Sequence, residues 1–172
     1  MEKQGFPELY YHIKKGTVIE GGEAMDNIYT IGFTKKSAEA FFELLKKNQV
    51  EVILDVRLNN TSQLAGFSKY PDIKYFLDKI CGIEYISDTK LAPEEWILKD
   101  YKAKKITWEQ YVIFFNELME KRNITEYIKE YYGPLEGKRI CLLCSEEKPV
   151  NCHRSLIAQR FQGIYGANVI DL

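Results

Sequence analysis

The stretch Ile140-Cys141-Leu142-Leu143-Cys144-Ser145-Glu146 passes from apolar to polar residues, and Asn151-Cys152-His153-Arg154-Ser155 follows after a short polar loop. The apolar part predicts a buried β-strand. The spacing of Leu156, Ile157 and Phe161 predicts that a helix begins directly after the loop. The first N–H groups of a helix lack partners within it and attract anions and thiolates. We therefore expect a chemical site where this strand, loop and helix meet.

The same alternation of strand and helix extends through the rest of the chain. Short apolar runs predict strands over residues 28–32, 51–56, 83–86, 139–143 and 168–170. Helices are predicted after Ser37, which would cap the first, over 71–80, and over 108–119, where Thr107 and Gln110 have capping-box spacing. Such alternation through short connections indicates a single three-layer α/β/α domain with a mostly parallel sheet of about five strands.

Length and composition narrow the class of protein. With 172 residues, of which 45% are apolar, the chain suits one well-buried domain, which we assign to residues 28–172. Residues 1–27 are predicted to form an N-terminal extension or flap. The formal charge of −1 argues against binding to nucleic acid or to an anionic membrane through the overall charge of the protein. No apolar run is long enough to cross a bilayer and no apolar signal core is present, so we predict no membrane contact, a cytoplasmic location and reduced cysteines. The oligomeric state is left open.

Residues that follow the predicted strands are the candidate ligand contacts. Parallel sheets bind ligands beyond the carboxyl ends of their strands, which selects Gly32 and Thr34 after the first strand. Asp55 and Arg57 lie two residues apart at the end of the second strand and therefore point to the same face. They form either an ion pair that closes the strand or an anion contact at the mouth of the sheet, and the sequence favours neither alternative.

The residues Cys144, Cys152, His153 and Arg154 allow three interpretations. The first is a reactive thiol, because a helix start and a nearby guanidinium lower a cysteine pKa from about 8.5. Cys152, which lies nearer the helix start, is predicted to have the lower pKa. The second is a metal site built from both thiols and the imidazole, but its spacing matches no common zinc motif and a fourth ligand is missing, so we predict no metal. The third is packing of inert thiols beneath a turn, with Arg154 paired to Glu146 or Asp55.

Two further features bear on partners and cofactors. The lysine-rich stretch over residues 99–105 could meet phosphates, but such runs are usually solvated, so contact with nucleic acid is not favoured. The glycines are scattered, and none clusters between a strand and a helix as in nucleotide-binding loops. The sequence therefore implies no cofactor.

A resemblance to a known family rests on Tyr29-Thr30-Ile31-Gly32, Leu54-Asp55-Val56-Arg57, Leu91-Ala92-Pro93, Leu142-Leu143-Cys144-Ser145-Glu146 and Cys152-His153-Arg154-Ser155. Together these segments resemble the family called domain of unknown function 488, over about residues 28–172. The resemblance implies one shared site that contains Gly32, Asp55, Arg57, Cys144, Glu146, Cys152, His153 and Arg154, but it supplies no reaction. Many members carry histidine where this chain has Phe33, so a role for that imidazole is absent or taken by Thr34. A looser resemblance is to rhodanese-like domains, which place a catalytic cysteine before an Arg-Ser that opens a helix.

These observations favour an enzyme that acts on a small anionic or nucleotide-like substrate, with Cys144 or Cys152 as the reactive thiol. Arg57 and Arg154 would bind the anion, converging on one cleft with Cys144 and Asp55. Glu146 or His153 would act as acid or base, and Asp55 would orient an arginine. Two alternatives stay open: a non-catalytic module associated with nucleic acid, and a structural domain whose thiols are inert.

Overall fold

A computed structural model of the protein describes residues 25–172, so most of the predicted N-terminal extension lies outside the described residues. At the centre is a five-stranded sheet with the strand order β3-β2-β4-β1-β5, in which every pair of neighbours is parallel. The strands are β1 (Asn27–Gly32), β2 (Val52–Asp55), β3 (Glu84–Ser87), β4 (Ile140–Cys144) and β5 (Asn168–Asp171). The predicted α/β class and the parallel sheet are confirmed.

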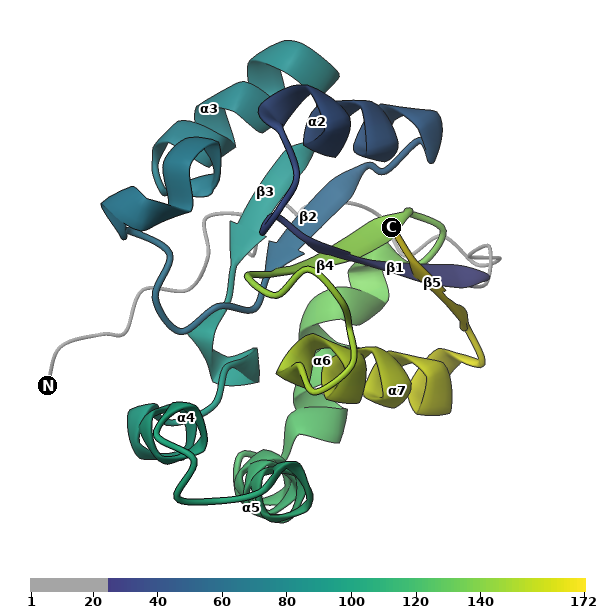
Figure 1. Cartoon of the computed structure of the whole chain (residues 1–172). Helices are drawn as coiled ribbons and strands as arrows, with labels where there is room; N and C mark the ends of the chain where they lie inside the picture. The colour runs from purple at the N-terminus through teal and green to yellow at the C-terminus, as the bar shows by residue number, and fades with distance from the viewer. Residues whose placement is uncertain (1–24) are drawn as a thin grey trace, which may run out of the picture.

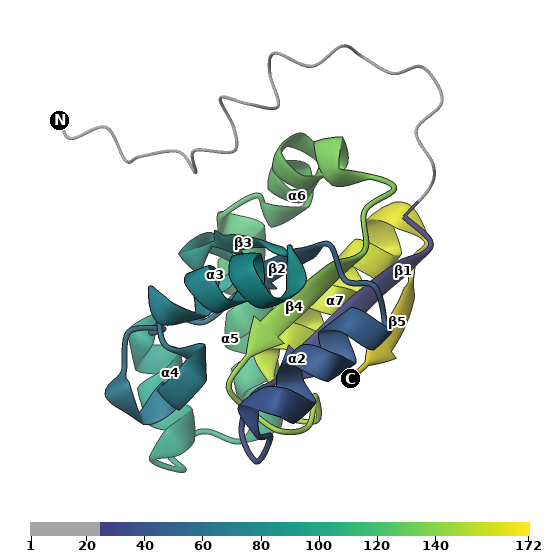
Figure 2. The ribbon, with the colours of Figure 1, turned by 90° about the horizontal axis from the view of Figure 1, so that it is seen from above.

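Helices cover both faces of this sheet (Figures 1 and 2). They are α2 (Ala38–Lys47), α3 (Asp72–Phe76), α4 (Glu95–Lys102), α5 (Trp108–Lys121), α6 (Ile124–Tyr132) and α7 (His153–Tyr165). Figure 1 shows α2 and α3 on one side of the sheet and α5, α6 and α7 on the other. Within residues 25–172, no helix combines the length and the apolar character that spanning a membrane requires.

The alternation of side chains along the strands divides the core into two layers, because successive strand residues point to opposite faces. Leu54, Leu142 and Cys144 pack in the layer that contains residues of α5, α6 and α7. Ile53 and Cys141 pack in the opposite layer, against α2 and the segment that contains α3. Cys144 therefore faces the helix that follows it in the chain, whereas Cys141 points away from that helix.

Local sequence signals fix the start of two helices as predicted. The Ser37 side chain accepts a hydrogen bond from the Ala40 amide at 3.1 Å and caps α2. Thr107 and Gln110 form the complete capping box at the start of α5. Both bonds satisfy N–H groups that a helix start leaves without partners.

Two helices, α4 and α6, were not predicted from the sequence. Ile124, Ile128 and Tyr132 of α6 are buried at helical spacing, so a local signal was present. α4 has a weaker signal, since Ile97 is its single fully buried side chain. Aromatic contacts with α5 place α4, with ring centroids of Trp96 and Phe114 5.3 Å apart.

Candidate functional site

The carboxyl ends of three neighbouring strands form one edge of the sheet, and the predicted site lies there. β4 lies between β1 and β2, with Gly32 paired to Cys144 and Asp55 paired to Leu143. α7 begins at the same edge, with Cys152 as its N-cap residue. The parallel topology thus brings together residues that are more than one hundred positions apart in the chain.

Gly32 lets the end of β1 touch the loop that follows β4. A Cβ atom at this position would lie 1.6 Å from the Glu146 carbonyl oxygen and 3.1 Å from Nη1 of Arg154. Real Cβ contacts are never this short, so any other residue would displace the loop. The Thr34 amide donates to the Ser145 carbonyl at 3.1 Å, which ties the two segments together a second time. Both residues thus act by shaping the loop, and the Thr34 side chain is exposed.

Arg154 lies beneath the same loop and is 1% exposed. Its Nη1 atom donates to the Glu146 carbonyl at 2.5 Å, and Nη2 donates to the Glu147 carbonyl at 3.3 Å. Nε donates to the Thr30 hydroxyl at 3.3 Å, and the Thr30 hydroxyl donates in turn to Asp171. No carboxylate of the described residues forms an ion pair with this guanidinium. Arg154 therefore binds the loop carbonyls from beneath and places a buried positive charge under the site, whereas the sequence predicted an anion contact.

Asp55 and Arg57 form a buried ion pair, which is one of the two alternatives left open by the sequence. Nη2 of Arg57 lies 2.6 Å from one carboxylate oxygen of Asp55, and Nε lies 2.8 Å from the other. The guanidinium also donates to the Ser68 carbonyl at 2.8 Å, and the Tyr85 hydroxyl donates to Asp55 at 2.5 Å. The Arg57 charge is thus neutralised at close range, which weakens its predicted role in anion binding.

Removing the negative partner of this pair should strongly destabilise the fold. In Asp55→Asn the Arg57 guanidinium, which is 3% exposed, would keep its charge without a carboxylate. We expect the free energy of unfolding to fall by about 3–5 kcal/mol. Chemical denaturation measures this loss, with Glu43→Gln, which breaks the exposed pair with Lys46, as a control that should leave stability unchanged. Equal stability of Asp55→Asn and the control would contradict the buried-pair interpretation.

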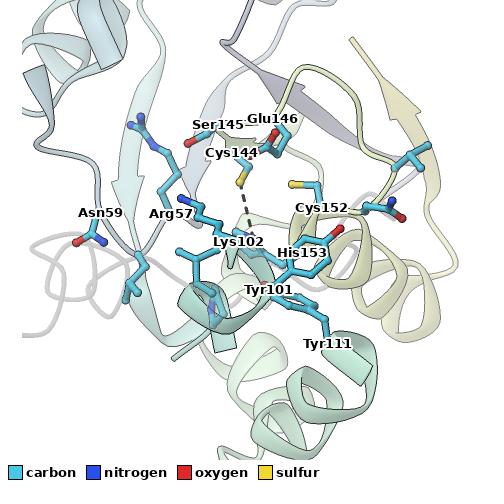
Figure 3. Close-up of a pocket in the computed structure, with 15 residues that line it drawn as sticks. Arg57, Asn59, Tyr101, Lys102, Tyr111, Cys144, Ser145, Glu146, Cys152 and His153 are labelled. Carbon is cyan, nitrogen blue, oxygen red and sulfur yellow. Dashed lines mark hydrogen bonds between the residues drawn. The ribbon is translucent and has the colours of Figure 1, made fainter. Parts of the chain in front are cut away.

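A cavity of about 290 Å³ opens at this edge of the sheet (Figure 3). The turn after β2 contributes Arg57 and Asn59 to its wall. The end of β4 and the loop that follows it contribute Cys144 and Glu146, and the start of α7 contributes Cys152 and His153. The hairpin of α4 and α5 closes the other side with Leu98, Tyr101, Lys102 and Tyr111. Arg154 is not among the lining residues. Both thiols and the imidazole are therefore within reach of a small molecule in the cavity.

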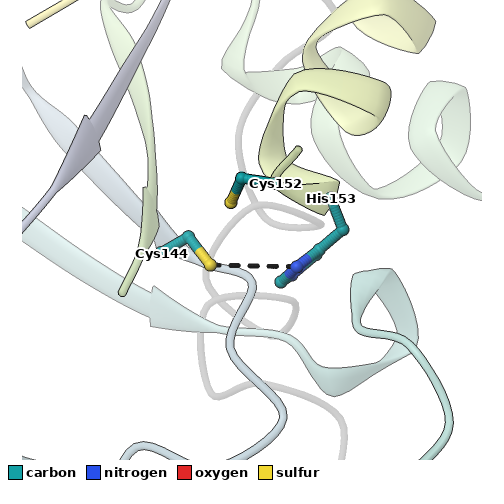
Figure 4. Close-up of side chains that lie close together, drawn as sticks. All are labelled: Cys144, Cys152 and His153. Carbon is teal, nitrogen blue, oxygen red and sulfur yellow. Dashed lines mark hydrogen bonds between the residues drawn. The ribbon is translucent and has the colours of Figure 1, made fainter. Parts of the chain in front are cut away.

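Cys144 and His153 face each other in this cavity (Figure 4). The Cys144 Sγ atom lies 3.8 Å from Nδ1 of His153, and Nε2 of the same ring lies 2.8 Å from the Val56 carbonyl oxygen. Because a carbonyl oxygen only accepts, Nε2 carries a proton, and the Nδ1 edge of the ring faces the thiol. A thiol, a base and a third group that orients the base are the parts of an activated nucleophile.

The two thiols of the site have opposite pKa shifts. The pKa of Cys144 is lowered, first by the hydrogen bond from the Cys152 thiol and also by the amides of Ser145 and Glu146 and the charge of Arg154, which together outweigh burial. The pKa of Cys152 is raised, first because its proton is held in that hydrogen bond and second by burial. The prediction that Cys152 has the lower pKa is wrong, because the Cys152 thiol and then the loop amides donate to the Cys144 sulfur at the strand end.

Comparison with models of known protein families identifies a family for this sequence. The model of the family "Domain of unknown function DUF488" matches residues 37–161. The chain belongs to this family. A search of curated proteins and a search of solved structures each gave no significant match, so the looser resemblance to rhodanese-like domains has no support.

The DUF488 chain thus brings the predicted site residues to one sheet edge but divides them into two groups. Cys144, Cys152, His153, Glu146 and Arg57 line the cavity, whereas Gly32, Thr34, Asp55 and Arg154 lie around it and shape it. The sequence did not place Tyr101, Lys102 and Tyr111 at this site, although Tyr101 and Lys102 belong to the basic stretch that was considered for phosphate contact. Tyr111 belongs to the aromatic stripe of α5 that was assigned to the core, and it is indeed 2% exposed, so its position on the cavity wall had no separate signal.

The DUF488 site also has donor atoms at a spacing that a metal ion could bridge. One donor atom each of Cys144, Cys152 and His153 lies within 4.8 Å of the others, and no fourth Cys, His, Asp or Glu of the described residues joins this group. Zn²⁺ accepts this donor set and would retain an open fourth position. The same hydrogen bond from Nε2 to Val56 would orient the imidazole for either role.

Proposed function

We propose that this DUF488 protein is an enzyme in which the Cys144 thiolate attacks a small anionic substrate bound in the cavity. The observation that carries the proposal is the Cys144–His153 pair, with the imidazole oriented by the Val56 carbonyl and both side chains on the cavity wall. Inert packed thiols need no oriented base, so this arrangement favours chemistry over packing.

In the proposed reaction the thiol proton passes through His153 to the leaving group, so protons are conserved. Nδ1 of His153 accepts the thiol proton, and the Cys144 sulfur forms a bond to the electrophilic atom of the substrate while the bond to the leaving group breaks. The protonated imidazole then returns the proton to the leaving group. The amides of Ser145 and Glu146, together with the buried charge of Arg154, stabilise the thiolate before the attack.

The charge in the cavity supports an anionic substrate. The two arginines predicted to bind the anion are engaged elsewhere, Arg57 by Asp55 and Arg154 by loop carbonyls. Lys102 lines the cavity and is exposed, and no acidic side chain of the described residues pairs with it. Its neighbours in the basic stretch differ, since Lys99 pairs with Glu95 and Lys105 with Asp100. Lys102 is therefore the cation available to a ligand, with Asn59 nearby as a polar contact.

Alkylation by iodoacetamide tests the nucleophile directly. The pKa values of Cys81, Cys141 and Cys152 are raised and that of Cys144 is lowered, so Cys144 should be the thiol modified near neutral pH. The rate should fall as the pH drops through the Cys144 pKa, with a midpoint below the free value of about 8.5. Mass spectrometry of peptides locates the label, and Cys144→Ser should abolish the fast phase. A midpoint at or above the free value would overturn the proposal. A reaction that requires prior chelation would also overturn it, in favour of a metal site.

A charged reagent tests the substrate class in the same assay. Iodoacetate carries a negative charge and iodoacetamide does not, so Lys102→Ala should slow the first reagent and leave the second unchanged. Lys104→Ala is the matched control, because Lys104 lies in the same basic stretch but does not line the cavity. Equal effects of both variants on iodoacetate would contradict the assignment of Lys102 as the anion contact.

A further inference from the structure

Cys144 and Cys152 come from two different elements and meet in the cavity. Cys144 ends β4 and Cys152 is the N-cap residue of α7, and their sulfur atoms lie within 4.8 Å of each other (Figure 4). The other two cysteines are excluded from this pair by position. Cys141 packs in the opposite core layer, and Cys81 ends the helical segment that follows α3.

The Cys152 side chain points toward Cys144 and does not cap the helix that follows it. As N-cap residue it accepts no capping hydrogen bond from the backbone N–H groups of α7. The loop before it carries exposed side chains at Glu146, Lys148, Val150 and Asn151. A disulfide requires the sulfurs to approach to about 2.05 Å, so this loop would have to move to let the bond form.

We propose that Cys144 and Cys152 form a reversible oxidation site, in which Cys144 reacts with a hydroperoxide and Cys152 resolves the product to an intramolecular disulfide. The inference rests on the proposed function, because it uses the same nucleophilic Cys144. It adds to that function a co-reactant class, a role for Cys152 and a means of switching the enzyme off.

The two steps balance in atoms and electrons. The Cys144 thiolate attacks the terminal oxygen of the hydroperoxide, the O–O bond breaks, and the departing alkoxide or hydroxide takes a proton, which leaves a sulfenic acid on Cys144. The Cys152 sulfur then attacks the Cys144 sulfur, the S–O bond breaks, and the released hydroxide leaves as water with the Cys152 proton. The peroxide is reduced by two electrons, and the two thiols are oxidised together.

Neighbouring groups favour the second step once the first has occurred. Whenever Cys144 is a thiolate, the hydrogen bond that it accepts from Cys152 keeps the proton on that second thiol, and conversion of Cys144 to a neutral sulfenic acid removes the negative charge. Nη1 of Arg154 lies 3.6 Å from the Cys152 sulfur, where it stabilises the thiolate that attacks. The disulfide removes the nucleophile, protects it from irreversible oxidation, and is reversed by an external thiol.

Peroxide titration with intact-protein mass spectrometry tests this inference on the full chain. With one equivalent of hydrogen peroxide, the wild-type protein should lose the mass of two hydrogen atoms, carry a Cys144–Cys152 linkage in its peptides, and regain its mass and its alkylation on reduction. Cys152→Ser should instead accumulate sulfenic acid that dimedone traps and then gain oxygen atoms. Cys81→Ser is the matched control and should form the linkage as the wild type does.

The outcomes separate this inference from the proposed function. If Cys144 is alkylated rapidly at neutral pH but the wild type and Cys152→Ser give the same oxidised products, the resolving role of Cys152 is overturned and the nucleophile stands. If Cys144 resists both iodoacetamide and peroxide in the folded protein, the proposed function fails and the oxidation site fails with it.

Discussion

Replacing Gly32 by alanine is expected to displace the loop after β4 and to destabilise the protein by about 2–4 kcal/mol. The new Cβ atom would fall 1.6 Å from the Glu146 carbonyl oxygen, which is backbone and cannot rotate away. Moving that carbonyl would also break its hydrogen bond with Arg154 and shift the amides that stabilise the Cys144 thiolate. Chemical denaturation and the pH profile of Cys144 alkylation should therefore change together, with the midpoint of the profile moving upward.

The matched control is a second glycine in the same chain, Gly163 of α7. A Cβ atom there meets no other atom within 4 Å, and alanine in a helix interior is more stable than glycine by about 0.5–1 kcal/mol. Gly163→Ala should therefore raise stability slightly and leave the alkylation profile unchanged. If Gly32→Ala behaved like this control, the close contact between β1 and the loop would not be what positions the site.

The strands of this fold could be predicted because their signals are local. Apolar runs such as the one that ends at Cys144 form buried parallel strands where helices cover both faces of a sheet. The capping pair of Thr107 and Gln110 indicates where α5 begins. α4 was not predicted, because contacts with another helix determine where it lies. Its position depends on contacts such as those of Trp96 and Tyr101 with rings of α5, which lie outside residues 95–102.

The members of the site could also be predicted, but not their roles. Strand ends and a helix start identified Cys144, Cys152, His153 and Arg154, because a parallel sheet gathers such residues at one edge. The direction of each side chain depends on tertiary distances instead. Arg154 turns inward because the loop carbonyls of Glu146 and Glu147 lie within its reach, and those carbonyls are there because Gly32 admits them.

Replacing Arg154 by methionine should lower both the stability of the fold and the reactivity of Cys144. The loop carbonyls of Glu146 and Glu147 would lose their donors, and we expect a loss of about 2–4 kcal/mol in the free energy of unfolding. The buried positive charge that favours the Cys144 thiolate would vanish as well, so the alkylation midpoint should rise. Denaturant titration measures the first effect and the alkylation profile the second.

A second arginine variant and a conservative substitution separate charge from loop structure. Arg160 lies on the same helix and contacts Glu120 and Asn116, so Arg160→Met should leave the Cys144 profile unchanged. Arg154→Lys keeps a positive charge but cannot bind both carbonyls in the planar geometry of a guanidinium. It should therefore lose stability like the methionine variant and recover part of the lowered Cys144 pKa. If Arg154→Met left the midpoint in place while the protein stayed folded, the charge beneath the loop would have no role in activating the thiol, and the amides and Cys152 alone would account for it.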